Sequence, residues 1–173
     1  RYRGRKKSEN EMLIRGRSPG LAKLDRPRLA RVHARERLFQ RLDECLEQPA
    51  VWVSGVAGSG KTTLVASYLN ARKLPALWYH VDSGDSDPAA CCHYLQIAAS
   101  RIDPQGGGKL PVFAPEQSAD PAAFLRRFFR AFYTCLESIP VIVFDNVHAA
   151  LSSAAFRQIL RTALREAPQG ISL

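Results

Sequence analysis

One stretch of the chain has the residue types and spacing of a phosphate-binding loop. The stretch GVAGSGKTT, residues 55–63, contains the pattern G-x-x-x-x-G-K-[ST] from Gly55 to Thr62. Its glycines, Gly55, Gly58 and Gly60, let the backbone curl so that successive N–H groups point at phosphate oxygens. We expect Lys61 to carry its charge to the β- and γ-phosphates, and Thr62 to offer its hydroxyl oxygen to Mg²⁺.

The surroundings of this loop agree with that chemistry. An apolar stretch, VWVSG (51–55), predicts a short buried strand before it, and a helix is predicted from about Lys61 to Ala71. The N-terminus of such a helix favours negative charge. Ser59 and Thr63 are then expected to contact α- or β-phosphate oxygens.

A second stretch, VIVFDNVHAA (141–150), has an apolar strand pattern that ends in Asp145. A carboxylate at the C-terminal end of a strand beside a phosphate loop can hold Mg²⁺ through its water shell. Many ATPases place Glu or Asp at the next position to polarise the attacking water, and this chain has Asn146. An amide can orient a water but cannot take its proton, so we expect slow hydrolysis. His148 is either a structural histidine or a group near the γ-phosphate.

The elements that position these residues alternate between strands and helices. Strands are predicted at 51–55, 76–82 and 141–145, and GISL (170–173) reads as the start of a fourth. Helices are predicted over 34–47, 61–71, from Asp87-Pro88, from Asp120-Pro121 and over 153–167, with a flexible loop at 103–119. Acidic N-caps followed by proline mark two of these helices. The pattern predicts an α/β fold with a parallel, helix-covered sheet.

Charge divides the chain into two parts. Residues 1–41 hold 14 Lys/Arg against 4 Asp/Glu, whereas residues 42–173 hold 11 against 12. We expect a basic tail of little order at 1–21 and a nucleotide-binding domain over 22–173. No apolar run reaches the length of a membrane span, and the four cysteines lack metal-site spacing. A cytoplasmic protein without membrane contact is expected. Three arginines, Arg157, Arg161 and Arg165, form a stripe on the last helix, either solvated or facing a partner.

Several of these stretches together resemble one family. KLDRPRLARVHARERLFQRLD (23–43), LWYHVDSGDSDP (77–88) and VIVFDNVH (141–148) follow one another around the phosphate loop. This order resembles the nucleotide-binding domain of STAND-type signal-transducing NTPases, as in large bacterial LuxR-type transcriptional activators of the maltose-regulator kind. The resemblance covers residues 22–173. It implies a P-loop NTPase three-layer sandwich of the ASCE/STAND type, ending near the start of its fourth strand, which would lie between the first and third.

The resemblance also implies a switch. ATP and an inducer would favour an active, self-associating form, and slow Mg²⁺-dependent hydrolysis in the full-length protein would return it to an ADP-bound resting form. Val32, His33 and Arg35 would lie near the adenine. DNA contact and a sensor arginine are expected beyond Leu173, so the 173-residue chain alone is expected to be poorly stable and to hydrolyse little or no ATP.

Two other functions fit the phosphate loop. A P-loop kinase for a small molecule is one, although such kinases often carry an Arg-rich lid and the 103–119 loop contains no arginine. A non-hydrolysing nucleotide-binding scaffold, or another AAA-like ATPase, is the other. Transfer of phosphate to a metabolite would favour the kinase, and tight ADP binding without turnover would favour the scaffold.

Overall fold

A computed structural model describes residues 22–29 and 33–173. The predicted tail, 1–21, and Val32 lie outside these residues. The longer helices and the strands are α2 (Glu36–Cys45), α3 (Lys61–Ala71), β1 (Ala76–His80), α4 (Pro88–Ile102), α6 (Pro121–Thr134), β2 (Val141–Asp145) and α7 (Ala154–Glu166). Short helical turns are η2 (Ser83–Ser86), α5 (Pro104–Gly107), η3 (Pro115–Ala119) and η4 (Val147–Ala149). No helix of this described part is long and apolar enough to cross a bilayer.

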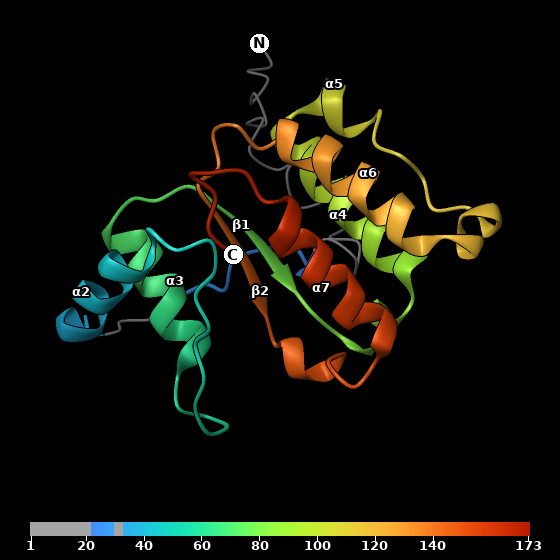
Figure 1. Cartoon of the computed structure of the whole chain (residues 1–173). Helices are drawn as coiled ribbons and strands as arrows, with labels where there is room; N and C mark the ends of the chain where they lie inside the picture. Colours follow the sequence, from blue (N-terminus) through green and yellow to red (C-terminus); the bar gives the residue numbers. More distant parts are fainter. Residues whose placement is uncertain (1–21, 30–32) are drawn as a thin grey trace, which may run out of the picture.

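The two strands lie between two layers of helices. Helices α2 and α3 cover one face, and α4, α6 and α7 cover the other (Figure 1). Successive side chains of a strand point to opposite faces, which explains the division of the core. Leu77 and Tyr79 pack into the cluster with α4, α6 and α7, whereas Trp78 packs with Phe39 of α2 and Leu69 of α3. This arrangement confirms the predicted three-layer α/β fold.

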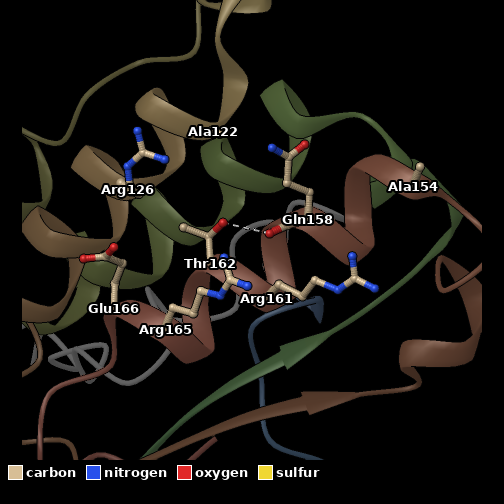
Figure 2. Close-up of a pocket in the computed structure, with 8 residues that line it drawn as sticks. All are labelled: Ala122, Arg126, Ala154, Gln158, Arg161, Thr162, Arg165 and Glu166. Carbon is tan, nitrogen blue, oxygen red and sulfur yellow. Dashed lines mark hydrogen bonds between the residues drawn. The ribbon is translucent and has the colours of Figure 1, made fainter.

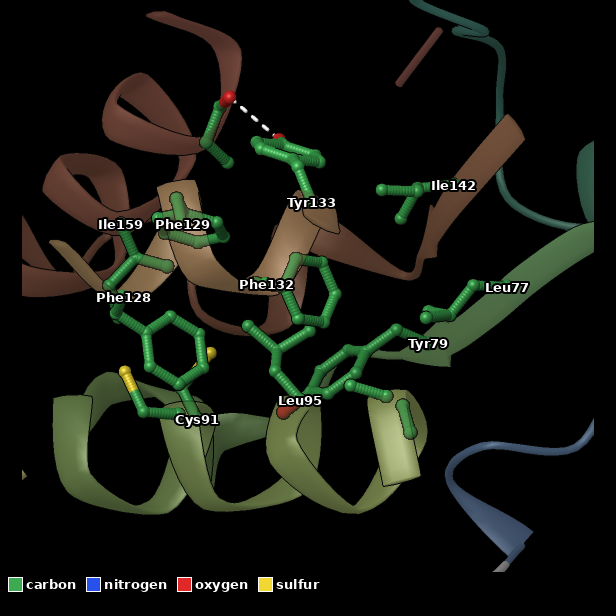
Figure 3. Packing of buried hydrophobic residues seen from close by; sticks show 14 of the residues in the cluster. Leu77, Tyr79, Cys91, Leu95, Phe128, Phe129, Phe132, Tyr133, Ile142 and Ile159 are labelled. Atoms are coloured by element: carbon green, nitrogen blue, oxygen red, sulfur yellow. Dashed lines mark hydrogen bonds between the residues drawn. The ribbon is translucent and has the colours of Figure 1, made fainter. Parts of the chain in front are cut away.

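The larger core cluster is rich in aromatic side chains from α6. Phe128 and Phe132 stack with their ring centroids 5.9 Å apart, and the Tyr133 hydroxyl donates a 2.7 Å hydrogen bond to the Ala163 carbonyl of α7 (Figure 3). The two helices predicted from Asp87-Pro88 and Asp120-Pro121 begin where the sequence predicts. Asp87 and Asp120 cap α4 and α6 by accepting backbone N–H bonds, each followed by proline.

Hydrogen bonds define the order of the extended segments. β1 and β2 are parallel, with Trp78 opposite Val143 and His80 opposite Asp145. On its other edge, β2 contacts the C-terminal residues, because Val141 and Ser172 form a parallel bridge. Leu173 then exchanges backbone bonds with the 49–51 segment, at 2.7 Å with the Val51 N–H and 3.1 Å with the Pro49 carbonyl. The residues at which a fourth strand was predicted therefore lie between the 49–51 segment and β2, which is the order that the family resemblance implies.

The prediction of a buried strand at 51–55 is wrong. This segment forms no ladder because its parallel neighbour reaches only as far as Val51, and Trp52 is 67% exposed. A cleft of about 500 Å³ lies between the segment and β2. Leu164 of α7 borders the same cleft, which explains why its side chain is 40% exposed.

Other boundaries differ by a few residues. The strand predicted at 76–82 ends at His80, since Asp82 caps the turn that follows, and the helix predicted at 34–47 spans Glu36–Cys45.

The 103–119 region, expected to be a flexible loop, contains α5 and η3. Gly107 is needed there because a Cβ on it would lie 2.4 Å from the backbone nitrogen of Ser100. Close packing of backbone on backbone orders the glycine run.

Candidate functional site

The phosphate loop has the backbone shape that its glycines predict. Gly58 and Gly60 have φ values of 76° and 81°, in the left-handed region that glycine adopts without strain. The Ser59 N–H donates to the Val56 carbonyl at 3.2 Å, which closes the turn, and α3 begins at Lys61 directly after Gly60. The loop therefore leads into a helix N-terminus, where N–H groups are open to an anion.

The side chain of Lys61 lies along this loop. Its Nζ donates hydrogen bonds to the Gly55 carbonyl at 2.9 Å and to the Val56 carbonyl at 3.0 Å. These carbonyls are neutral acceptors, and a lysine ammonium binds charged oxygens more strongly. A phosphate group placed inside the loop would therefore compete well for the Lys61 ammonium.

Thr62 and Asp145 come together at the start of α3. The Thr62 hydroxyl donates to Oδ1 of Asp145 at 2.8 Å, and both side chains are half-buried. The parallel sheet brings them together because Asp145 is the last residue of β2, on the edge beside the loop. One hydroxyl and one carboxylate oxygen suit Mg²⁺, which takes few protein ligands and completes its shell with phosphate and water. The residues present therefore fit the predicted metal.

His80 is a member of this site that sequence reasoning missed. It lies opposite Asp145 in the ladder, and its Nδ1 is 3.4 Å from Oδ2 of Asp145. Thr62 and His80 thus contact the two different oxygens of one carboxylate. The sequence contains one indication of this role, because His80 ends a predicted strand and the ends of neighbouring parallel strands meet at one edge of a sheet. Placing His80 opposite Asp145, however, requires the register of the two strands, which the sequence alone does not give.

Asn146 has a structural task in addition to the one predicted. Its φ is 64°, a left-handed conformation that asparagine tolerates better than most residues. Its Nδ2 donates to the Val81 carbonyl at 3.0 Å and so joins the ends of β1 and β2. Its carbonyl oxygen and the second hydrogen of its Nδ2 are left to contact a water. His148, in η4, is exposed.

The remaining predicted residues differ in their distance from the loop. Arg35, at the start of α2, lies beside it, with Nη1 3.5 Å from the Ser59 carbonyl. Its Nη2 is 3.5 Å from the position that a Cβ on Gly60 would take. His33 is exposed, and Thr63 is half-buried on α3. The structure brings Arg35 to the loop, and among the residues it describes there is no comparable contact between His33 and the loop.

A buried ion pair fixes the end of β1 and was not predicted either. The Lys23 ammonium donates to Asp82 at 2.6 Å and to Asp85 at 2.7 Å, and Tyr79 also donates to Asp85. Lys23 and Asp85 are almost fully buried. Burial lowers the pKa of Lys23, but the bonds to both carboxylates outweigh it, and the pKa lies above its usual value. The Lys23 carbonyl also accepts a hydrogen bond from the His80 N–H at 2.7 Å. We call Lys23, Asp82 and Asp85 the lysine clamp, since together they hold the end of the strand that carries His80.

Comparison with known proteins identifies the family to which the chain belongs. The chain is 30% identical over 156 residues to the "HTH-type transcriptional regulator MalT" of Cronobacter sakazakii, covering 88% of this chain and 17% of that protein. It is 31% identical over 155 residues to the protein of the same name from Serratia proteamaculans, with the same coverage. The chain thus spans about a sixth of the length of these relatives. Residues 30–173 match the AAA ATPase domain, and the chain, a P-loop NTPase domain of the STAND type, belongs to that family.

Proposed function

We propose that this chain is the ATP- and ADP-binding switch module of a bacterial LuxR-type transcriptional regulator. The observation that carries the proposal is the meeting of Thr62 and Asp145 beside the loop that holds Lys61. Mg²⁺ bound there would neutralise charge between the β- and γ-phosphates. Thr62 and Asp145 would hold it, while Lys61 would leave the Gly55 and Val56 carbonyls to bind phosphate oxygens.

Other residues would fix the rest of the nucleotide. The N–H groups of Gly58, Ser59 and Gly60 would surround the phosphates, with Gly55 opening the loop and Thr63 contacting the phosphate nearer the ribose. Arg35 supports a binding role for the segment before α2, because it already reaches the Ser59 carbonyl. Val32 and His33, on the same segment, would lie toward the adenine.

Hydrolysis in the full-length protein is proposed to be slow. Position 146 carries a side-chain amide, which cannot take a proton from water and therefore cannot act as a general base. Asn146 would at most orient a water, through its Oδ1 or through the second N–H of its Nδ2. A slow step lets the ATP-bound form persist, as a signal requires.

The remaining parts of the proposal concern the whole protein. The names of the relatives support a role in transcription, with DNA contacted by a helix-turn-helix outside this chain and with the protein in the cytoplasm. ATP binding would favour self-association, and ADP would favour the resting form.

Sedimentation velocity of the full-length regulator tests the switch. With a non-hydrolysable ATP analogue, Mg²⁺ and inducer, we expect a larger species than with Mg-ADP. The Lys61→Ala variant should stay small under both conditions. Equal sizes with both nucleotides, at saturation, would contradict a nucleotide-dependent switch while leaving nucleotide binding itself intact.

A further inference from the structure

Between residues 42 and 173, the basic residues are concentrated on two neighbouring helices, α6 and α7. Six of the 11 Lys/Arg of residues 42–173 lie on α6 and α7, whereas only one of the 12 Asp/Glu, Glu166, lies there. The rest of residues 42–173 therefore carries five basic against 11 acidic residues. All six basic residues on these helices are arginines. This uneven distribution gives the face formed by α6 and α7 a positive potential, although the charges of residues 42–173 nearly cancel.

The six arginines fall into two groups of three. Arg127 donates to Gln117, Arg130 forms a 2.6 Å pair with Glu166, and Arg157 donates to the Leu151 and Ser152 carbonyls. The other three are exposed, and within residues 22–29 and 33–173 they make no ion pair or hydrogen bond: Arg126, Arg161 and Arg165. The arginines with local partners have a structural explanation, and these three do not.

The three arginines without such partners border one groove. It has a volume of about 390 Å³ and lies between α6 and α7. Figure 2 shows Arg126 projecting from α6 and Arg161 and Arg165 from α7, with Thr162 between them. Small side chains, Ala122 and Ala154, leave the groove open. Its one acidic residue, Glu166, is already paired with Arg130.

We propose that this arginine groove, lined by Arg126, Arg161 and Arg165, docks an acidic protein segment, with carboxylates as the recognised groups. A guanidinium offers a planar fork that pairs with a carboxylate through two hydrogen bonds. Arg161 and Arg165 lie one helical turn apart, which matches two carboxylates spaced four residues apart on a docked helix. The residues that line the groove include no aromatic ring on which a nucleic-acid base could stack.

Fluorescence anisotropy of the 173-residue chain with a labelled acidic peptide tests the groove. The probe is a 15-residue helical peptide with glutamates four residues apart, measured at low salt. We expect binding that weakens at least about tenfold in the triple variant Arg126→Gln, Arg161→Gln, Arg165→Gln. The matched control removes three exposed charges elsewhere, Arg37→Gln, Arg41→Gln and Lys109→Gln, and should bind within about twofold of wild type.

Three further measurements make the outcome decisive. Circular dichroism should superimpose for all variants, because each substituted side chain is exposed. Saturating Mg-ADP should leave peptide binding unchanged, which separates the groove from the phosphate loop. The proposal would be overturned if the folded wild type did not bind the peptide. It would also be overturned if both triple variants lost peptide affinity to the same extent. Tighter, groove-dependent binding of a DNA duplex than of the peptide would overturn it in favour of a nucleic-acid surface.

Discussion

The Thr62 hydroxyl donates a 2.8 Å hydrogen bond to Oδ1 of Asp145, although 83 positions separate the two residues. Two distant motifs thereby form one site, at the edge of the sheet where β2 ends and α3 begins. The bond also orients the carboxylate before any metal is bound. Pre-organised oxygen ligands reduce the cost of ordering a site, so this pair is where the dependence on Mg²⁺ should originate.

Asp145→Asn should remove the Mg²⁺-dependent part of nucleotide affinity. An asparagine keeps the size of the side chain and an oxygen that can accept from Thr62, but it loses the negative charge that attracts the cation. We expect ADP affinity without Mg²⁺ to stay within about twofold of wild type. Titration calorimetry with and without Mg²⁺ measures both values. If the gain from Mg²⁺ survives in the variant, Asp145 does not hold the metal.

Asn146→Asp in the full-length protein should raise ATP turnover, because it supplies the carboxylate that the amide replaces. The same change removes the Nδ2–H that donates to the Val81 carbonyl, and we expect it to cost about 1 kcal/mol of stability. Phosphate release at a temperature well below the melting transition separates the two effects. Asn146→Gly is the control, since glycine keeps the left-handed backbone without a side chain. Unchanged or reduced turnover in the aspartate variant would mean that the amide is not rate-limiting.

Lys23→Met should destabilise the fold, because it leaves Asp85 buried without its cation. Breaking a buried pair in this way costs about 3 kcal/mol or more, which lowers Tm by roughly 6 °C or more. Lys109→Met, at an exposed position, is the matched control and should leave Tm within about 2 °C of wild type. Equal melting temperatures for the two variants would show that the clamp does not stabilise the chain.

The same clamp predicts a pH dependence. The Lys23 hydrogen bond holds the pKa of Asp82 below its usual value, so its contribution is present above about pH 4 and is lost as pH falls further. The raised pKa of Lys23 means that its contribution is lost only at alkaline pH, above about 10. Denaturant titrations should therefore show the largest difference between wild type and Lys23→Met from about pH 5 to 9. A difference that grows below pH 4 would contradict the assignment.

Gly107→Ala should destabilise the chain, whereas Gly108→Ala should not. A Cβ on Gly107 would meet the Ser100 backbone at 2.4 Å, and backbone cannot move aside as a flexible side chain can. At Gly108 the nearest atom is the Pro104 carbonyl oxygen, at 3.5 Å. We expect a loss of about 1–3 kcal/mol for the first variant and a change within about 0.5 kcal/mol for the second. Thermal melts of both variants check this, and equal melts would place α5 away from α4.

The sequence predicted the features that depend on local residues. The caps at Asp87 and Asp120 and the phosphate loop each follow from residues a few positions apart. The prediction of a strand at 51–55 was wrong because strand pairing depends on a distant partner. In the described part of the structure, Leu173 forms backbone hydrogen bonds only with Pro49 and Val51. His80, Lys23 and the bond from Asn146 to Val81 share that cause, since each contact exists only once the register of β1 and β2 is known.

Calorimetric titration of the folded chain with ADP, with and without Mg²⁺, tests the nucleotide site most directly. Hydrogen bonds between charged groups contribute about 1.5–3 kcal/mol, so Lys61→Ala should weaken ADP binding at least about tenfold under both conditions. Lys109→Ala, a control that removes the same charge at an exposed position, should bind as wild type does. Wild-type binding that tightens with Mg²⁺ and is lost in Lys61→Ala is the predicted result. No binding by the folded wild type, or equal binding by Lys61→Ala, would contradict the account.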